Sequence, residues 1–370
     1  MGASLPHMST TERLRRAQEA TAAGGLDAIL VTPGSDLRYL TGYAALPLER
    51  LTCLVLPANG NATLVVPKLE RPAAEASGVG AAVDIVDWPE TADPVALVAG
   101  MLPSARTVGL DDHMWAEKVL RFRAAMPDAE QVLAGDVLSD LRMRKFDDEI
   151  DALREAAAAI DRVHARMADW LRPGRTEREV GRDIAYAIVS EGHARADFVI
   201  VASGPNSASP HHDTSDRVID AGDPVVVDIG GTTEAGYCSD ETRTYAVGEP
   251  PAEFVTAYRT LLDAQVAACE HAGPGVTAES VDTAASSVLE SAGLGAYFVH
   301  RTGHGIGLET HEEPYLVEGN TTLLEPGMAF SIEPGFYIPG RYGARIEDIV
   351  VTTASGADRL NLRPRELAVL

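Results

Sequence analysis

The chain has 370 residues, 45% of them hydrophobic, which is enough for two or three domains whose cores need no disulfide or metal staple. Its 31 basic and 55 acidic residues leave a formal net charge of −24, which would repel nucleic acid and anionic membrane surfaces. No window approaches the about 18 consecutive apolar residues of a membrane span, and residues 1–25 lack the apolar stretch of a signal peptide. We therefore expect a cytoplasmic protein that binds neither nucleic acid nor membranes.

The N-terminal part of the chain predicts a small α/β domain over residues 9–143. Residues 1–7 resemble the remnant of an expression tag, because a helix-capping pattern begins only at Ser9. Short β-rich runs then alternate with helical stretches, and an Asn-Gly pair at 59–60 indicates a hairpin. The predicted strands are Ala28–Thr32, Thr52–Leu56, Ala62–Val66, Val83–Val86 and Thr107–Leu110, and the predicted helices include Pro94–Met101 and Trp115–Ala125.

A long amphipathic helix predicts the start of a second domain, over residues 146–370. Its apolar stripe has the three- and four-residue spacing of a helix face. The stripe consists of Ile150, Leu153, Ala157, Ile160, Met167 and Leu171. His164 falls on this stripe, so we interpret it as a hydrogen-bonded packing residue and not as a ligand.

The second domain contains a weak internal repeat. A shift of 101 positions superposes Pro173-Gly174-x-Thr176 on Pro274-Gly275-x-Thr277 and a helix ending at Gly192 on one ending at Gly293. In both copies a Pro-Gly turn leads through a threonine cap into a helix, and β-rich sequence follows. A duplicated unit, with an active site between its two halves, is the expectation.

Two aspartates end or interrupt apolar strand patterns after the first repeat helix. Asp228 closes the run Pro224-Val-Val-Val-Asp228, and Asp240 follows twelve residues later, beyond a glycine-rich turn. On adjacent antiparallel strands the two carboxylates would repel each other unless a divalent cation bound both. A helix cap for one aspartate and an ion pair with Arg243 for the other would explain them without a metal.

After the second repeat helix, the segment from His300 to His311 holds three of the ten histidines of the chain. Gly303, Gly305 and Gly307 surround His304 with residues that lack side chains, which favours close approach of another backbone. A loop with incidental histidines is the alternative. Further along, Glu333 and Glu347 end or interrupt two strand-like runs, although a single glutamate there is more often an ion-pair partner.

Together these residues supply four carboxylates and one imidazole, the ligand inventory of a two-metal hydrolytic site. The predicted ligands are Asp228, Asp240, His304, Glu333 and Glu347. The three cysteines, Cys53, Cys238 and Cys269, are too scattered for a disulfide framework or a thiolate zinc site, so we expect reduced thiols. Oxygen-rich ligation without thiolate favours two divalent ions, with Mn²⁺ first and Co²⁺, Fe²⁺ or Zn²⁺ as alternatives.

The ordered motifs Asp-Ile-Gly, Ser-Asp-Glu-Thr-Arg-Thr, Gly-His-Gly-Ile-Gly-Leu-Glu-x-His-Glu, Ile-Glu-Pro-Gly and Arg-Ile-Glu-Asp resemble those of the pita-bread metallopeptidases, and most of all their Xaa-Pro branch of prolidase and aminopeptidase P. The resemblance implies a creatinase-type α/β N-terminal domain and a duplicated, pseudo-two-fold α+β pita-bread catalytic domain. It also implies a homodimer.

Carried over to this chain, the resemblance assigns roles to the five predicted ligands. It implies Asp228 on one metal ion, His304 and Glu333 on the other, and Asp240 and Glu347 bridging both. Glu333 is also the candidate proton shuttle. The family usually separates its two aspartates by eleven positions and this chain by twelve, so we expect an extra residue in the hairpin turn or in a bulge.

The resemblance also assigns residues that contact the substrate. His211 matches a histidine near the scissile bond, although His212 beside it could take that place. His311 matches the residue that stabilises the oxyanion, and His300 and Arg345 match groups that line the prolyl pocket.

The predicted function is hydrolysis of the bond before proline in proline-containing di- or oligopeptides, by a hydroxide bound to two metal ions. A prolidase, which is an Xaa-Pro dipeptidase, is favoured over an aminopeptidase P that acts on longer peptides. A different metal-dependent amide or ester hydrolase and a non-catalytic peptide-binding relative are further alternatives, although relatives without metal chemistry are expected to have lost ligands.

Overall fold

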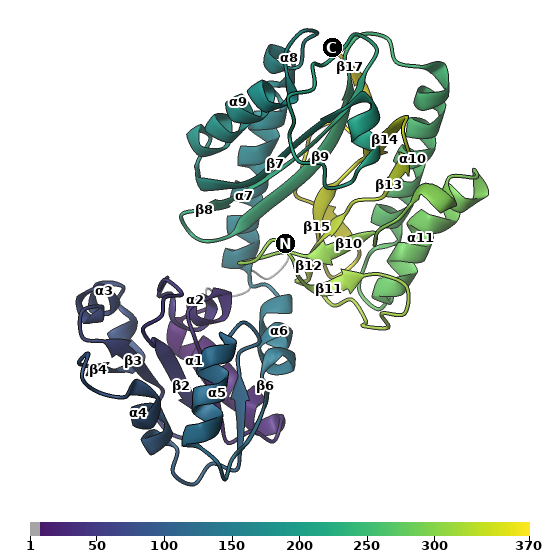
Figure 1. Ribbon diagram of the computed structural model, residues 1–370. Coiled ribbons are helices and arrows are strands. Elements are labelled where there is room, and N and C mark those ends of the chain that lie inside the picture. The colour runs from purple at the N-terminus through teal and green to yellow at the C-terminus, as the bar shows by residue number, and fades with distance from the viewer. Residues whose placement is uncertain (1–7) are drawn as a thin grey trace. The chain divides into compact units, whose positions relative to one another are not determined.

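The computed structural model describes residues 8–370 and divides them into two units, an N-terminal unit that ends at Arg142 and a C-terminal unit from Met143 to Leu370 (Figure 1). The predicted tag remnant at residues 1–7 lies outside the described residues. No helix among the described residues is long and apolar enough to cross a membrane.

The N-terminal unit is built on one six-stranded sheet with the order β4-β3-β2-β1-β5-β6. Its strands are β1 (Ala28–Val31), β2 (Cys53–Pro57), β3 (Thr63–Pro67), β4 (Asp84–Trp88), β5 (Thr107–Leu110) and β6 (Glu130–Leu133). Its helices are α1 (Thr10–Ala23), α2 (Ser35–Thr41), α3 (Arg71–Ala76), α4 (Pro94–Met101), α5 (Ala116–Ala125) and α6 (Gly135–Met143), with a short 3₁₀ turn at Val79–Ala81. All four residues of β1 are buried, which fits a central strand covered on both faces. The predicted hairpin joins β2 to β3, which pair antiparallel.

The C-terminal unit places two sheets and a hairpin between two groups of helices. The first sheet has the order β17-β9-β8-β7, the second has the order β11-β10-β12-β15-β16, and β13 pairs with β14. The strands are β7 (His193–Ser203), β8 (Pro224–Thr233), β9 (Cys238–Ala246), β10 (Gly303–Gly305), β11 (Glu312–Leu316), β12 (Ala329–Ile332), β13 (Gly335–Ile338), β14 (Tyr342–Arg345), β15 (Asp348–Thr352), β16 (Ala357–Arg359) and β17 (Ala368–Val369). The helices are α7 (Asp147–His164), α8 (Met167–Trp170), α9 (Glu177–Ser190), α10 (Ala252–His271) and α11 (Ala278–Ser291), with 3₁₀ turns at Gly204–Ala208 and Gly295–Tyr297. Figure 1 shows α7 to α9 on one side of the strands and α10 and α11 on the other.

The internal repeat predicted from the sequence is present in the structure. Thr176 and Thr277 occupy the N-cap positions of α9 and α11, and each forms an isolated bridge with a later segment, to Val218 and to Leu323. The two caps differ in one respect. The Thr176 hydroxyl accepts a hydrogen bond from the amide of Glu179, whereas the Thr277 side chain makes no capping bond.

The long helix predicted from residue 146 ends earlier than its apolar stripe suggests. α7 stops at His164, and the chain continues through the one-turn helix α8. The amides of Arg166 and Asp169 bond to carbonyls three residues earlier, which tightens the chain out of the α-helical pattern. Met167 and Leu171 remain buried in the core, so the hydrophobic pattern holds although the helix does not.

Alternation along β8 separates the core from the polar face of the first sheet. Val225, Val227 and Ile229 belong to the core that also contains Ile160 of α7 and Ile184 of α9. Because successive side chains of a strand point to opposite faces, Asp228 lies on the face turned away from these helices. The hydrophobic pattern of the strand therefore fixes the direction of its carboxylate.

Candidate metal centre

The structure brings the five predicted ligands together from both repeats. Nε2 of His304 lies 3.1 Å from Oε1 of Glu333 and 3.6 Å from Oδ2 of Asp240. One side-chain ligand atom from each of Asp240, His304 and Glu347 lies within 4.8 Å of the others. The remaining ligand, Asp228, shares the Arg345 guanidinium with Glu333, at 2.5 Å and 3.9 Å.

The β8–β9 ladder explains how two aspartates twelve residues apart meet on one face. Asp228 pairs with Thr242, and Asp240 pairs with Gly230, so the two aspartates are offset by two positions and lie on the same face. The pairing runs without a register shift from Pro224 to Thr232. The residue beyond the usual family spacing therefore lies in the turn, where the amide of Gly236 bonds to the carbonyl of Thr233, and it does not form a bulge.

The glycines around His304 allow three strands to pack closely. A Cβ atom on Gly303 would lie 1.9 Å from the carbonyl oxygen of Ser331, and one on Gly305 would lie 2.2 Å from that of Glu313. Real side chains do not tolerate such distances. β10 can therefore carry His304 between β11 and β12 only because its neighbours on either side lack side chains.

Hydrogen bonding leaves one nitrogen of His304 for a ligand. Nδ1 lies 3.1 Å from the carbonyl oxygen of Gly305, and since a carbonyl only accepts, this nitrogen carries the proton. Nε2 then faces Asp240 and Glu333. Fixing the proton on the outer nitrogen is how proteins orient histidine ligands toward a metal ion.

The electrostatics of the cluster fit a divalent cation. Burial raises the pKa of Asp240 well above its usual value, and the Glu347 and Asp228 carboxylates raise it further. Burial, and then Glu333 and Asp228, also raise the pKa of Glu347. Burial acts to raise the pKa of Glu333 too, but its close contact with His304 and then the nearby positive charge lower it below its usual value.

Two buried oxygens in the cluster add to this fit. Among the described residues, Oδ1 of Asp228 and Oε1 of Glu347 have no hydrogen-bond partner. A buried carboxylate oxygen without a partner is costly. A bound cation would satisfy both oxygens and offset the mutual repulsion of the carboxylates, and an all-oxygen-and-nitrogen donor set is suited to Mn²⁺ and similar ions.

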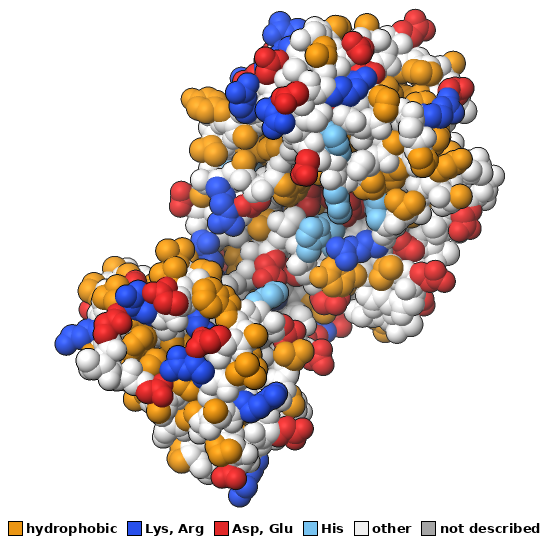
Figure 2. Space-filling view, in the orientation of Figure 1, with side chains coloured by type: hydrophobic (Ala, Val, Ile, Leu, Met, Phe, Trp, Pro, Cys, Tyr) orange, Lys and Arg blue, Asp and Glu red, His pale blue; other side chains and the backbone are white. Residues whose placement is uncertain are grey.

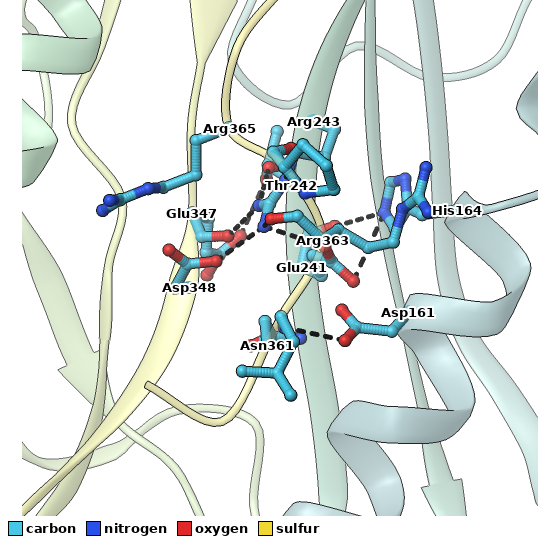
Figure 3. Close-up of polar contacts among 12 residues, drawn as sticks. Asp161, His164, Glu241, Thr242, Arg243, Glu347, Asp348, Asn361, Arg363 and Arg365 are labelled. Carbon is cyan, nitrogen blue, oxygen red and sulfur yellow. Dashed lines mark hydrogen bonds and ion pairs between the residues drawn. The ribbon is translucent and has the colours of Figure 1, made fainter. Parts of the chain in front are cut away.

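A second set of residues, whose roles were not predicted from the sequence, forms hydrogen bonds to the predicted ligands and their neighbours. The Thr242 hydroxyl donates to Glu347 at 2.7 Å. Arg243 donates to the backbone carbonyl of Glu347 and, at 2.6 Å, to Asp348, as Figure 3 shows. On the other repeat, the Ser331 hydroxyl donates to Glu333 at 3.0 Å. Thr242 lies two positions from Asp240 on β9, and Ser331 of β12 lies two positions before Glu333, which is the spacing that could have identified them.

Figure 3 also shows His164 on the far side of β9. Its ring nitrogens lie 2.9 Å from the Tyr245 hydroxyl and 3.2 Å from the Glu241 carbonyl. Burial and then the nearby Arg243 lower its pKa to about 3, so the ring is neutral. His164 is thus a hydrogen-bonded packing residue, as predicted.

A cavity of about 300 Å³ opens beside the cluster within the C-terminal unit. Figure 2 shows histidine side chains gathered on this unit with basic side chains beside them. The lining residues are Pro210, His211, His300, Arg301, His304, His311, Glu333 and Arg345. The four residues predicted to contact substrate, His211, His300, His311 and Arg345, are all among them.

The histidines of the cavity differ in their contacts. His211 lines the cavity, whereas Nε2 of His212 lies 2.9 Å from Glu177. The rings of His311 and His304 are 4.1 Å apart and meet edge to face. Burial and then the neighbouring His304 lower the pKa of His311 to about 4, so its imidazole is neutral at pH 7.

Comparison with known proteins decides the family. Residues 151–354 match the model of metallopeptidase family M24, and residues 13–144 match the creatinase/prolidase N-terminal domain. The chain belongs to metallopeptidase family M24. It therefore combines a creatinase-type N-terminal domain with the pita-bread catalytic domain, as predicted.

Relatives of this M24 chain match it over most of its length. A probable dipeptidase, PepE, of Mycobacterium tuberculosis is 54% identical over 97% of this chain and 96% of its own. A prolidase structure from Thermococcus sibiricus has a TM-score of 0.92 and 37% identity, covering 99% of this chain and all of its own. An X-Pro aminopeptidase structure from Thermotoga maritima has a TM-score of 0.82 and 28% identity, covering 95% and 100%.

We expect Asp240→Ala and Glu347→Ala each to lower the metal content of the purified protein and to abolish peptidase activity. Each variant removes one carboxylate of the cluster that includes His304. The fold should persist, because the stability of a chain with hydrophobic cores in both units does not depend on one site. Metal per chain is measured by elemental analysis after dialysis, with the exposed Glu318→Ala as the matched control. Full metal content and activity in either variant would contradict the two-metal site.

Proposed function

We propose that this chain is a metal-dependent Xaa-Pro dipeptidase that cleaves the bond preceding proline. The observation that carries the proposal is the convergence of four carboxylates and one imidazole beside a small histidine-lined cavity. The division into an N-terminal domain over residues 9–143 and a catalytic domain over residues 146–370 belongs to the proposal. So does the assignment of peptide hydrolysis to the second domain.

The proposed metal arrangement uses the five ligands in three roles. Asp228 would hold one ion, His304 and Glu333 would hold the other, and Asp240 and Glu347 would serve both. When bound, such ions polarise a peptide carbonyl and lower the pKa of a nearby water. Mn²⁺ is the proposed ion, because the donors are oxygen and nitrogen and no thiolate takes part.

The side chains of the cavity supply the proton transfers and the charge stabilisation. Glu333 lines the cavity beside the proposed metal site, so it is the proposed group that takes a proton from the attacking water and delivers it to the prolyl nitrogen. That delivery matters because the nitrogen of an X-Pro bond is a tertiary amide without an N–H. The neutral His311 can donate a hydrogen bond to the oxyanion that forms on the carbonyl.

The remaining cavity residues position the substrate. We propose that His211 lies beside the scissile bond, while His212 is engaged by Glu177. His300 and Arg345 form one wall through Tyr337, whose hydroxyl is 2.9 Å from Nε2 of His300 and accepts from Arg345 at 2.6 Å. A wall in which each polar group is already partnered keeps its shape when the proline ring enters.

Similarity favours a dipeptidase over an aminopeptidase. The named dipeptidase is 54% identical and the prolidase 37%, against 28% for the X-Pro aminopeptidase. A homodimer and a cytoplasmic location complete the proposal. The three free thiols, of which Cys53 and Cys238 are buried, support a reducing environment.

The dipeptidase proposal is tested by the ratio of kcat/KM for Ala-Pro to that for Ala-Pro-Ala. We expect the dipeptide to be cleaved at least about tenfold more efficiently, since one charge-assisted hydrogen bond to its carboxylate suffices for that factor. Equal or faster cleavage of the tripeptide would make the chain an aminopeptidase. No cleavage of either peptide by the metal-loaded protein would refute Xaa-Pro peptidase activity.

His311→Ala should reduce kcat by about 100- to 1,000-fold, which is the usual cost of removing one oxyanion donor. Because His311 is not among the proposed ligands, its removal should leave the metal content unchanged. The exposed His271→Ala is the control and should match the parent protein in both measurements. Loss of metal from His311→Ala would show that His311 is a ligand and that the proposed roles are exchanged.

A homodimer should be visible by sedimentation velocity at micromolar concentration, because the family resemblance that implies a homodimer extends over both domains of this chain. The experiment is run on the metal-loaded chain, with activity measured on the same sample. A fully active sample that contains only monomer would exclude the dimer without affecting the proposed chemistry.

A further inference from the structure

We propose that Arg301 binds the carboxylate of the substrate's C-terminal proline and so selects dipeptides over longer peptides. The inference rests on the proposed Xaa-Pro dipeptidase function and names a residue that determines its specificity. A dipeptide carries its free carboxylate on the residue just after the scissile bond. A site for dipeptides therefore needs a cation close to the groups that cleave the bond.

Arg301 lies in the cavity itself. It follows His300 directly in the chain and lines the cavity together with His211, His311 and Glu333. Its guanidinium carbon is 4.3 Å from the centre of the Tyr315 ring, over which it stacks. Stacking on a face orients the guanidinium plane and leaves its N–H edge available for a hydrogen-bonding partner.

No acidic side chain neutralises Arg301 in the part of the chain that the structure describes. Its side chain forms no hydrogen bond and no ion pair there, whereas its backbone carbonyl is bound to His300 at 2.8 Å. An arginine that faces a cavity and has only a ring contact retains its full capacity for a two-point bond with a carboxylate.

The other arginine of the cavity cannot take this role. Arg345 is 2% exposed and donates to Asp228, Tyr337 and Thr242 through all three of its nitrogens. Its charge is already balanced by a ligand carboxylate. A substrate carboxylate would have to displace one of these buried bonds.

The electrostatic setting favours a free cation in the cavity. The chain carries a formal net charge of −24, and two bound divalent ions would only balance the four carboxylates of the cluster without leaving a positive charge for a substrate carboxylate. A carboxylate entering the cavity meets this field unless a fixed positive charge lies at its binding position. An arginine supplies that charge at every pH at which the enzyme works. The cavity volume of about 300 Å³ also lies at the lower end of the range for ligand sites, which suits a dipeptide.

The test compares Ala-Pro with Ala-Pro amide, two substrates of nearly equal size that differ in the C-terminal charge. In the metal-loaded parent chain, kcat/KM should be higher for Ala-Pro. In Arg301→Met this preference should fall by about 10- to 100-fold, mostly through a higher KM for Ala-Pro, which is the range expected for a hydrogen bond to a charged group. Arg301→Lys, which keeps the charge but loses the fork, should retain part of the preference.

The matched control is Arg154→Met, because Arg154 is exposed and forms a salt bridge with Asp151 outside the cavity. It should keep the parent preference. Metal content and melting temperature are measured for every variant, so that a misfolded Arg301→Met would be recognised. In that case the substrate preference of Arg301→Lys tests the inference. A parent chain that cleaves Ala-Pro while both Arg301 variants keep the parent preference overturns the Arg301 inference and leaves the dipeptidase function standing. A parent chain that cleaves neither substrate overturns both.

Discussion

Repulsion among buried carboxylates is the constraint around which the C-terminal unit is organised. Asp228, Asp240 and Glu347 are 8%, 4% and 1% exposed, and Glu333 completes the group. Holding like charges together away from water costs several kcal/mol per group unless cations compensate. The strands impose the proximity, because each carboxylate lies on a strand or just beyond one whose other face is fixed in a hydrophobic core. The fold thus gathers several negative charges in one buried place. A divalent cation bound there would offset the repulsion among these carboxylates.

Hydrogen-bond donors in the surrounding strands stabilise these carboxylates and also fix their orientation. Thr242 and Ser331 each donate one hydrogen bond to a ligand carboxylate, and Arg345 contacts Asp228. These bonds orient the carboxylates and leave Oδ1 of Asp228 and Oε1 of Glu347 without a hydrogen-bond partner among residues 8–370. The proposed ligands are thus positioned by the protein itself, which is the condition for a well-defined coordination geometry when a metal ion binds.

The sequence was most informative where strand periodicity and unusual chemistry coincide. A carboxylate at the end of an apolar strand run is unusual, so Asp228 and Glu333 stood out as candidates, but only the set of five residues and the family resemblance made them predicted metal ligands. Glycines around His304 indicated close backbone packing for the same reason. The end of α7 at His164 was not predictable, because Met167 and Leu171 continue the helical spacing after the backbone has left the helix.

Residues that act through long-range partners were also beyond sequence reasoning. Arg301 and Arg345 are both arginines near histidines or acidic residues in sequence, and nothing in their local pattern separates them. Only the fold shows that one is buried among three acceptors and the other stacks on Tyr315. Likewise, the spacing of Asp228 and Asp240 revealed an extra residue, but the continuous pairing of β8 and β9 was needed to place it in the turn.

The distribution of the ligands between the two repeats bears on how such a site could have arisen. Asp228 and Asp240 come from the first repeat, and His304, Glu333 and Glu347 come from the second. Neither half alone carries both the imidazole and the full set of carboxylates. If the chain descends from a single repeated segment, the ancestral segment would have needed to associate with a second copy before any such centre could form. Within one fused chain the two halves are free to differ, and here only the second repeat supplies a histidine to the five predicted ligands.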